Sequence, residues 1–366
     1  MSELLKSLKK SSTAGYAHVL SESGFMYEKD HTRTHVPAIN IAFSGEVDGG
    51  LTSGLTVLAG PSKHFKSNLG LVGVAAYLKK YPNAMCVFID TEFGITPAYL
   101  EAQGVNPDRV LHIQCESVER MKFEMANQLK ALNERKKAMK KGDEPDRVVF
   151  FIDSVGNVAS AKEIDDAQNE KSVADMTRAK QLKSLFRIIT PYFTMLDIPC
   201  IAINHTYETQ EMYSKTVMSG GTGIMYSADT VIILGKQQEK DGKEIVGYHF
   251  IMNIEKSRFV KEKRKIPLSV TYEKGINPFS GLLEIALDTG HLVKPSNGWY
   301  QRSFVDMETG EQTVEEKKWR AKETENVAFW KPIINDESFK EGVRRKFCLG
   351  QLSLDDLNEE VESLFD

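Results

Sequence analysis

The chain has 366 residues, of which 41% are hydrophobic and 27% charged, and its formal net charge at pH 7 is −4. This length and apolar content are enough for one large folded domain with smaller appendages. The negative balance excludes a protein that coats nucleic acid with its whole surface, so any DNA contact must be local.

The sequence carries neither a membrane signal nor a disulfide pattern. No apolar run is long enough to cross a bilayer, and residues 1–10 lack the apolar stretch of a secretory signal. The four cysteines stand far apart and form no CxxC pair: Cys86, Cys115, Cys200 and Cys348. We therefore expect a cytoplasmic protein that makes no membrane contact and keeps reduced core thiols instead of disulfides or zinc.

Residues 1–30 are polar, with leucines at positions 4, 5 and 8 in a helical spacing. This pattern predicts a separate N-terminal helical arm. Five apolar runs follow, with helical stretches between them: Leu55–Ala59, Met85–Asp90, Val148–Asp153, Ile198–Asn204 and Thr230–Leu234. Strands that alternate with helices predict an α/β fold with a mainly parallel, doubly wound sheet.

The sharpest motif follows the first of these strands and opens a helix. It consists, in chain order, of Gly60, Pro61, Ser62, Lys63, His64, Phe65, Lys66 and Ser67. In such a phosphate loop, backbone N–H groups and the helix N-terminus hold the β-phosphate of ATP, Lys66 reaches the β- and γ-oxygens, and Ser67 binds Mg²⁺. Phe65 replaces the second glycine of the G-x-x-x-x-G-K-[ST] pattern, so the match needs support from its context.

Two carboxylates near strand ends supply that context. Asp153 ends the run 148–153, where a Mg²⁺ carboxylate belongs. Glu92 follows the run 85–90, which we expect beside the phosphate-loop strand, at the sheet edge where α/β proteins bind ligands. Glu92 would there orient and deprotonate the attacking water. The alternatives are that Asp153 caps a loop and that Glu92 forms a surface ion pair.

Two polar segments, 157–171 and 206–222, follow the third and fourth strands. The second carries side chains suited to single-stranded DNA: Tyr207, Met212, Tyr213, Lys215, Gly220 and Gly221. Aromatic and apolar side chains stack on bases, lysine meets phosphate, and glycines allow close backbone passage. A loop this long is uncommon in a compact domain unless it is functional, so we interpret it as DNA-binding; the alternative is a disordered solvent loop.

The pattern changes after residue 235. The turn signal Asp241–Gly242 and the strand-like runs 231–236, 248–254 and 266–272 predict an antiparallel extension of the sheet. Beyond residue 278 the sequence becomes polar and aromatic, which predicts a small C-terminal α+β lobe. Residues 354–366 carry only acidic charges, and this tail is either a solvated terminus or a competitor of DNA for a basic groove.

Five segments resemble the RecA family: 60–67, 88–99, 151–159, 201–211 and 220–233. Within that superfamily, "AINHTYETQEM" from Ala202 and "GGTGIMYSADTV" from Gly220 are most similar to the UvsX-type bacteriophage recombinases. The similarity extends from Asp30 to Gly350. It implies an N-terminal oligomerisation arm (1–30), a RecA-type P-loop ATPase and DNA-binding core (31–277), and a C-terminal lobe with an acidic tail (278–366).

The resemblance also implies roles for single residues. Lys66 and Ser67 bind phosphate and Mg²⁺, Glu92 activates water, Tyr99 packs on the adenine, and Asp153 completes the Mg²⁺ environment. The motif chemistry described above assigns the same roles to the phosphate-loop residues and to the two carboxylates.

The resemblance implies roles for three further residues that lie far from the phosphate loop in the sequence. His205 stands where bacterial relatives carry a glutamine that senses the γ-phosphate, and imidazole can donate to a phosphate oxygen in the same way, although a lone histidine in a loop is more often structural. Lys256 and Arg258 match cations that reach a neighbouring subunit's ATP across a filament interface.

The function implied is ATP-dependent DNA strand exchange by helical filaments on single-stranded DNA, in recombination, repair and recombination-dependent replication. ATP and Mg²⁺ are the expected cofactors. The expected partners are single- and double-stranded DNA, further copies of the chain, a recombination mediator and a single-stranded-DNA-binding protein. The alternatives are a ring-forming RecA-fold helicase and a non-catalytic ATP-binding DNA coat protein.

Overall fold

The computed structural model describes residues 2–13, 17, 19, 29–140, 142–170, 177–209, 216–242, 244–307 and 309–350. Contacts divide the chain into two compact units, residues 1–30 and residues 31–366. In the first unit, helix α1 (Glu3–Ser11) begins after Ser2, whose hydroxyl accepts a hydrogen bond from the backbone N–H of Leu5. The leucines of α1 at positions 4, 5 and 8 are exposed.

The second unit is built on one large sheet. Its strands lie in the order β10 (Gly275–Ile276), β9 (Lys265–Thr271), β8 (Glu244–Ser257), β7 (Thr230–Asp241), β1 (Gly54–Gly60), β5 (Pro199–Glu208), β4 (Val148–Asp153), β2 (Met85–Asp90) and β3 (Val110–Gln114). Strands β7 through β3 pair in parallel, whereas β8, β9 and β10 extend the sheet antiparallel. The predicted parallel sheet with an antiparallel extension is confirmed.

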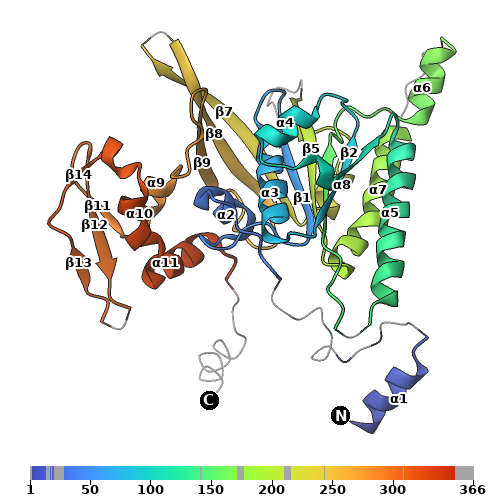
Figure 1. Cartoon of the computed structure of the whole chain (residues 1–366), viewed down its shortest axis with the longest axis horizontal. Coiled ribbons are helices and arrows are strands. Elements are labelled where there is room, and N and C mark those ends of the chain that lie inside the picture. The colour runs from blue at the N-terminus through green and yellow to red at the C-terminus, as the bar shows by residue number, and fades with distance from the viewer. Residues whose placement is uncertain are drawn as a thin grey trace, which may run out of the picture. The chain divides into compact units, whose positions relative to one another are not determined.

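Helices cover both faces of this sheet, and each covered face forms its own hydrophobic cluster (Figure 1). Helices α2 (Pro37–Ser44) and α3 (Lys66–Lys80) pack on one face, and α5 (Val118–Ala138) and α7 (Thr177–Met195) on the other. The strands alternate their apolar side chains between the two clusters, as the period of a pleated strand requires. The site at the strand ends therefore rests on a sheet that is buried on both sides.

Helix α3 lies unusually close to the sheet beneath it. A Cβ atom added at Gly70 would lie 2.7 Å from the Phe151 ring, and one added at Gly73 would lie 2.9 Å from Ile201. Only glycine permits this approach, because real Cβ atoms do not come so near other carbon atoms. The helix that follows the phosphate loop is thereby seated directly on β4 and β5.

One expectation about the sheet was wrong, and one strand was not predicted. Strand β2 does not lie beside the phosphate-loop strand β1, because β5 and β4 stand between them. Strand β3 was not expected at all. It forms the sheet edge, and its side chains are mostly exposed, so the sequence lacks the apolar run by which the buried strands could be recognised.

The two polar segments contain more structure than expected. The first forms helix α6 (Ala161–Gln168), which begins at a capping box between Ser160 and Glu163. In the second, β5 continues to Glu208 and pairs antiparallel with β6 (Thr216–Met218), and helix α8 (Gly223–Ser227) follows. A hairpin therefore replaces much of the predicted loop, and its residues 210–215 lie outside the described part of the chain.

A second sheet forms the predicted C-terminal lobe. Its antiparallel strands are β11 (Leu292–Ser296), β12 (Trp299–Val305), β13 (Gln312–Val314) and β14 (Trp319–Arg320), with helices α9 (Leu282–Asp288), α10 (Val327–Ile334) and α11 (Glu337–Phe347). Buried side chains of these helices, such as Trp330 and Phe339, belong to the same cluster as α2 and α3. The acidic tail 354–366 lies outside the described residues.

The four cysteines are free thiols, and three of them are buried. Burial raises the pKa of Cys86 to about 12 and that of Cys115 to about 11, and the pKa of Cys200 also rises. Cys348 is half-buried, and burial raises its pKa as well. Among the described residues, no helix is both long and apolar enough to cross a membrane.

Candidate active site

The phosphate loop joins β1 to α3 in a backbone conformation that favours glycine at two positions. Lys63 and Phe65 both have positive φ angles, 59° and 64°, although each carries a side chain. Phe65 stands immediately before Lys66, the first residue of α3. The ammonium of Lys66 donates to the carbonyl of Pro61 over 2.8 Å, which closes the loop on itself. The glycine expected at position 65 is replaced without loss of the left-handed geometry.

A small cavity of about 170 Å³ opens above this loop. Its lining comes from the phosphate loop, the first turn of α3, the segment after β2 and the ends of β4 and β5: Ser62, Lys63, His64, Phe65, Lys66, Ser67, Asn68, Glu92, Tyr99, Asp153, Ile203 and His205. The structure thus brings together residues that are up to 143 positions apart in the sequence. Several predicted site residues within the described part of the chain do not line this cavity: Gly60, Pro61, Tyr207, Gly220, Gly221, Lys256 and Arg258.

Glu92 holds a fixed position because one of its oxygens accepts three hydrogen bonds. Oε1 accepts from the Ser154 hydroxyl over 2.6 Å and from the Asn157 amide over 3.1 Å, and it lies 3.0 Å from His205 Nε2. The bond from His205 is the largest cause that lowers the pKa of Glu92 to about 2, and Ser154 and Lys66 add to it against the effect of burial. Glu92 is therefore ionised throughout the neutral pH range.

Asp90 anchors the turn that carries Glu92, a role that the sequence analysis missed. Its buried carboxylate accepts from the backbone N–H groups of Glu92 and Phe93 over 3.0 and 2.8 Å, and its other oxygen lies 2.9 Å from His112 Nε2. An acidic residue at the end of an apolar strand was the available signal. Its contacts follow from the turn geometry, which the residue types alone do not define.

Asp153 and Lys66 are the buried charges of the site. Burial raises the pKa of Asp153 to about 7, against the effect of a hydrogen bond with Ser67, and the nearby carboxylate of Glu92 raises it further. Burial also lowers the pKa of Lys66, while Asp153 and Glu92 oppose that change. A carboxylate beside a serine hydroxyl is an oxygen-donor set that suits Mg²⁺, which keeps its other positions for water and phosphate.

Tyr99 and His205 frame the cavity from two sides. Tyr99 lies on α4 (Pro97–Ala102), which begins at the N-cap Thr96, and its half-buried ring packs against the core. Burial raises the pKa of the Tyr99 hydroxyl, while a hydrogen bond with Asn68 lowers it. His205 is packed closely against Gly156, where an added Cβ would lie 2.4 Å from the imidazole.

Two comparisons with known proteins decide the family. Residues 5–277 match the sequence model of the RecA N-terminal domain, which is more than half of the chain. The chain belongs to the RecA family. Residues 279–343 of this RecA-family protein match the C-terminal domain of the bacteriophage T4 recombination and repair protein, so the two matches meet close to residue 278.

Three relatives of this RecA-family chain match between 72% and 100% of its length. The recombination and repair protein of Enterobacteria phage T4 is 55% identical over 366 residues, which are 100% of this chain and 90% of that protein. Protein RecA of Pseudomonas syringae pv. syringae is 25% identical over 341 residues, 90% of each chain. Protein RecA of Ruminococcus albus is 26% identical over 267 residues, 72% of this chain and 62% of that protein.

Lys256 and Arg258 lie away from the phosphate loop, near the opposite end of β1. Lys256 pairs in register with Val231 on β7, and its ammonium donates to the carbonyls of Met225, Tyr226 and Ala228 over 2.7–3.1 Å. The guanidinium of Arg258 lies 2.9 Å from buried Asp229, which also accepts from a β1 N–H group. Within one chain, both cations therefore have structural partners.

The residues expected to bind DNA are only partly within the described chain. Tyr207 lies on β5 and is 56% exposed, and Gly220 and Gly221 form the turn after β6 with φ angles of 82° and 79°. Met212, Tyr213 and Lys215 lie outside the described residues. Arg178 on α7 was missed by the sequence analysis: it donates to the carbonyls of residues 155, 156 and 158 and to the Ser219 hydroxyl. It thereby joins the segment after β4 to the hairpin.

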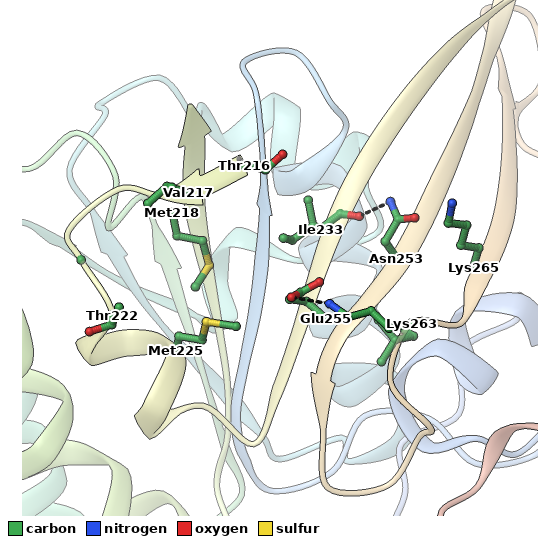
Figure 2. Close-up of a pocket in the computed structure, with 12 residues that line it drawn as sticks. Thr216, Val217, Met218, Thr222, Met225, Ile233, Asn253, Glu255, Lys263 and Lys265 are labelled. Carbon is green, nitrogen blue, oxygen red and sulfur yellow. Dashed lines mark hydrogen bonds and ion pairs between the residues drawn. The ribbon is translucent and has the colours of Figure 1, made fainter. Parts of the chain in front are cut away.

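A second cavity of about 520 Å³ lies between this hairpin and the antiparallel part of the sheet (Figure 2). Met218 and Met225 form one wall, and strands β7 and β8 form the other with Ile233 and Asn253. The Asn253 amide donates to the carbonyl of Ile233 over 2.8 Å, and Glu255 pairs with Lys263 over 2.6 Å. Within the described part of the chain, this cavity shares no lining residue with the phosphate site.

Proposed function

We infer the activity of this RecA-type recombinase from one group of residues at its phosphate loop. We propose that it is an ATP-dependent DNA strand-exchange enzyme that forms helical filaments on single-stranded DNA. The observation that carries the proposal is the convergence of Lys66, Glu92 and His205 on one small cavity. A non-catalytic coat protein would not need a carboxylate held by three donors beside a phosphate loop.

The residues suit hydrolysis of ATP by water. Backbone N–H groups of the phosphate loop and the N-terminus of α3 would hold the β-phosphate, and Lys66 would offset charge on the transferring γ-phosphoryl group. Glu92 is ionised, and its second oxygen, Oε2, takes no part in the three hydrogen bonds described above. That oxygen would accept the proton of the attacking water.

Mg²⁺ fits the same site. Ser67 and Asp153 would hold the ion through a hydroxyl and a carboxylate oxygen, and the bound ion would neutralise charge on the nucleotide phosphates. Among the described residues, no group of three His, Cys, Asp or Glu side chains forms a metal site on its own. A single carboxylate with substrate phosphates is the usual way in which a nucleotide enzyme binds Mg²⁺.

A continuous strand links the nucleotide to the proposed DNA contact. His205 and Tyr207 both lie on β5, and Thr206 pairs with Met218 across the hairpin. His205 would exchange its contact with Glu92 for a γ-phosphate oxygen when ATP binds. Tyr207, Gly220 and Gly221, with Met212, Tyr213 and Lys215, would then stack on bases and approach the phosphate backbone.

Filament formation would complete the site from a neighbouring protomer. Lys256 and Arg258 would approach the ATP of that neighbour, and the N-terminal arm would dock on the next core in a head-to-tail contact that does not close. The resemblance adds a recombination mediator and a single-stranded-DNA-binding protein as partners. Such a protein would act in the cytoplasm of the host cell, where its DNA is.

A strand-invasion assay tests the proposal. The full-length chain is incubated with labelled single-stranded DNA and either a homologous or a heterologous supercoiled duplex, each with and without ATP and Mg²⁺. We expect joint molecules only with homology and ATP, because base pairing reads the sequence. If joint molecules form equally with the heterologous duplex, the proposed strand exchange is ruled out. Closed rings in electron micrographs would favour a helicase.

A further inference from the structure

The β7–β8 hairpin contacts the phosphate loop at two points. The ring of Phe65 stacks on that of Phe250 on β8, with centroids 5.1 Å apart and planes at 21°. On β7, the ammonium of Lys236 donates to the carbonyl of Lys63 over 3.2 Å. Lys236 and Phe250 are directly paired across the hairpin, so one rung of the sheet holds both ends of the segment 63–65.

These two contacts fall on the two residues with left-handed backbones. Lys63 and Phe65 have φ angles of 59° and 64°, a region that glycine adopts freely and that side-chain-bearing residues disfavour. The phosphate-loop motif supplies a glycine at position 65, and this chain supplies phenylalanine. Some other interaction must therefore hold position 65 in that conformation.

The stack with Phe250 is suited to that task. Phe250 is 3% exposed and belongs to the hydrophobic core, so its ring is a fixed surface. Rotation of Phe65 out of the left-handed region would separate the stacked rings and leave a gap in the core beside the nucleotide cavity. The stack therefore stabilises Phe65 in a left-handed conformation that this residue otherwise disfavours.

Aromatic residues beside this pair hold Lys236 in position. The ammonium of Lys236 lies 3.7 Å from the centre of the Tyr248 ring, and that ring lies 5.9 Å from Phe250. The Tyr272 hydroxyl donates to the Tyr248 hydroxyl over 3.1 Å. A cation above an aromatic face is attracted to it, so this contact keeps Lys236 directed toward the phosphate loop.

We propose that Phe250 and Lys236 are positioning residues for the phosphate loop, and that they replace the conformational freedom of the missing glycine by holding residues 63 and 65 in place. The proposal rests on the proposed nucleotide site and deepens it. It implies that Phe65 and Phe250 form a functional pair: phenylalanine at position 65 requires the ring at position 250, whereas glycine would not.

The test is a double-mutant cycle on the full-length chain with steady-state ATP turnover at saturating single-stranded DNA. Phe250→Leu keeps an apolar side chain but removes the stack, and we expect a roughly 5- to 10-fold rise in the KM for ATP with kcat within about twofold. In the Phe65→Gly background the same substitution should raise KM less than about twofold, because glycine adopts the left-handed region unaided. Phe65→Gly alone gives the reference KM of that background, so the cycle compares the effect of Phe250→Leu with and without the ring at position 65.

Conservative and control variants separate positioning from core packing. Phe250→Tyr retains the ring and should restore a near-normal KM. Phe329→Leu changes an equally buried phenylalanine in the C-terminal lobe and should lower the melting temperature without a change in KM. Lys236→Met should raise KM about threefold, whereas Lys240→Met, which removes an exposed cation from the same strand, should leave it unaltered.

The outcomes are distinguishable from a failure of the proposed function. If the unmodified chain does not hydrolyse ATP, the proposed function fails. If it does, and Phe250→Leu raises KM equally with phenylalanine or glycine at position 65, or leaves KM unchanged while lowering stability, the positioning role is overturned. Should Phe250→Leu fail to fold, Lys236→Met against Lys240→Met decides, and an equal KM in those two variants counts against the proposal.

Discussion

The two ends of the parallel strands both carry charged side chains, but the contacts of these side chains differ. At the carboxyl ends of the strands, Lys66, Glu92 and Asp153 face one cavity. Toward the other end, Lys256 donates to three backbone carbonyls, and Arg258 pairs with Asp229. The first set is arranged around space for a ligand, and the second is bonded within the chain.

The pKa values of the charged groups also differ between the two ends of the strands. The two carboxylates of the cavity are shifted in opposite directions, with the pKa of Glu92 lowered to about 2 and that of Asp153 raised to about 7. Opposed shifts in neighbouring acids are typical of sites with divided chemical roles. Burial is the largest cause that lowers the pKa of Lys256, and its bonds within the chain must be exchanged before it can act on a neighbour.

The largest expected effect lies at the cavity. Glu92→Gln keeps the side-chain shape but removes the base, so we expect ATP turnover to fall roughly 100- to 10,000-fold while nucleotide affinity changes only a few-fold. Turnover by phosphate release and affinity by equilibrium binding give the two values. Glu101→Gln, an exposed change on α4, is the control. Turnover that survives in Glu92→Gln would remove this residue from the mechanism.

A smaller effect is expected at the other end of the strands. Lys256→Met should lower ATP turnover on single-stranded DNA about 100-fold, since trans-acting cations supply this order of rate or more. ATP binding by dilute protein should be unaltered, because Lys256 does not line its own cavity. Lys265→Met on β9 removes a nearby exposed cation as a control. If Lys256→Met instead lowers only the melting temperature, its bonds to the three carbonyls are its whole role.

The smallest effect is a dependence on pH that separates the two carboxylates. Because the pKa of Asp153 is raised to about 7, the carboxyl is protonated below that pH and Mg²⁺ must displace a proton. Affinity for Mg²⁺·ATP should therefore fall up to about tenfold per pH unit below pH 7 and level off above it. The Asp153→Asn variant gives the pH dependence of affinity that comes from the titration of ATP itself. Profiles of equal slope in both proteins would assign the titration elsewhere.

Much of the fold was predictable, because its signals are local. The run 148–153 was recognised as a strand from its apolar residues, and β4 has those bounds. The phosphate loop, Glu92 and Asp153 were identified by spacing relative to strands, and they do meet. The adjacency of β2 to β1 was wrong, because the order of parallel strands depends on crossovers that no local pattern records.

Contacts between distant segments remained outside prediction. The hairpin pairs Thr206 with Met218, and Arg178 donates to carbonyls after β4. The residue types alone do not indicate which segments these residues contact. Position 65 shows the limit most clearly. The sequence marks Phe65 as a departure from the motif, whereas its stack on Phe250, 185 residues later, depends on the sheet register.

The buried thiols have a practical consequence for spectroscopy. Cys86, Cys115 and Cys200 are inaccessible and weakly acidic, so a maleimide dye at neutral pH would find little thiolate on them. Replacement of the half-buried Cys348 by serine would leave a chain on which one new cysteine, such as Tyr226→Cys at a 78% exposed site, is labelled selectively. Single-molecule fluorescence of filament growth would then require two substitutions instead of five.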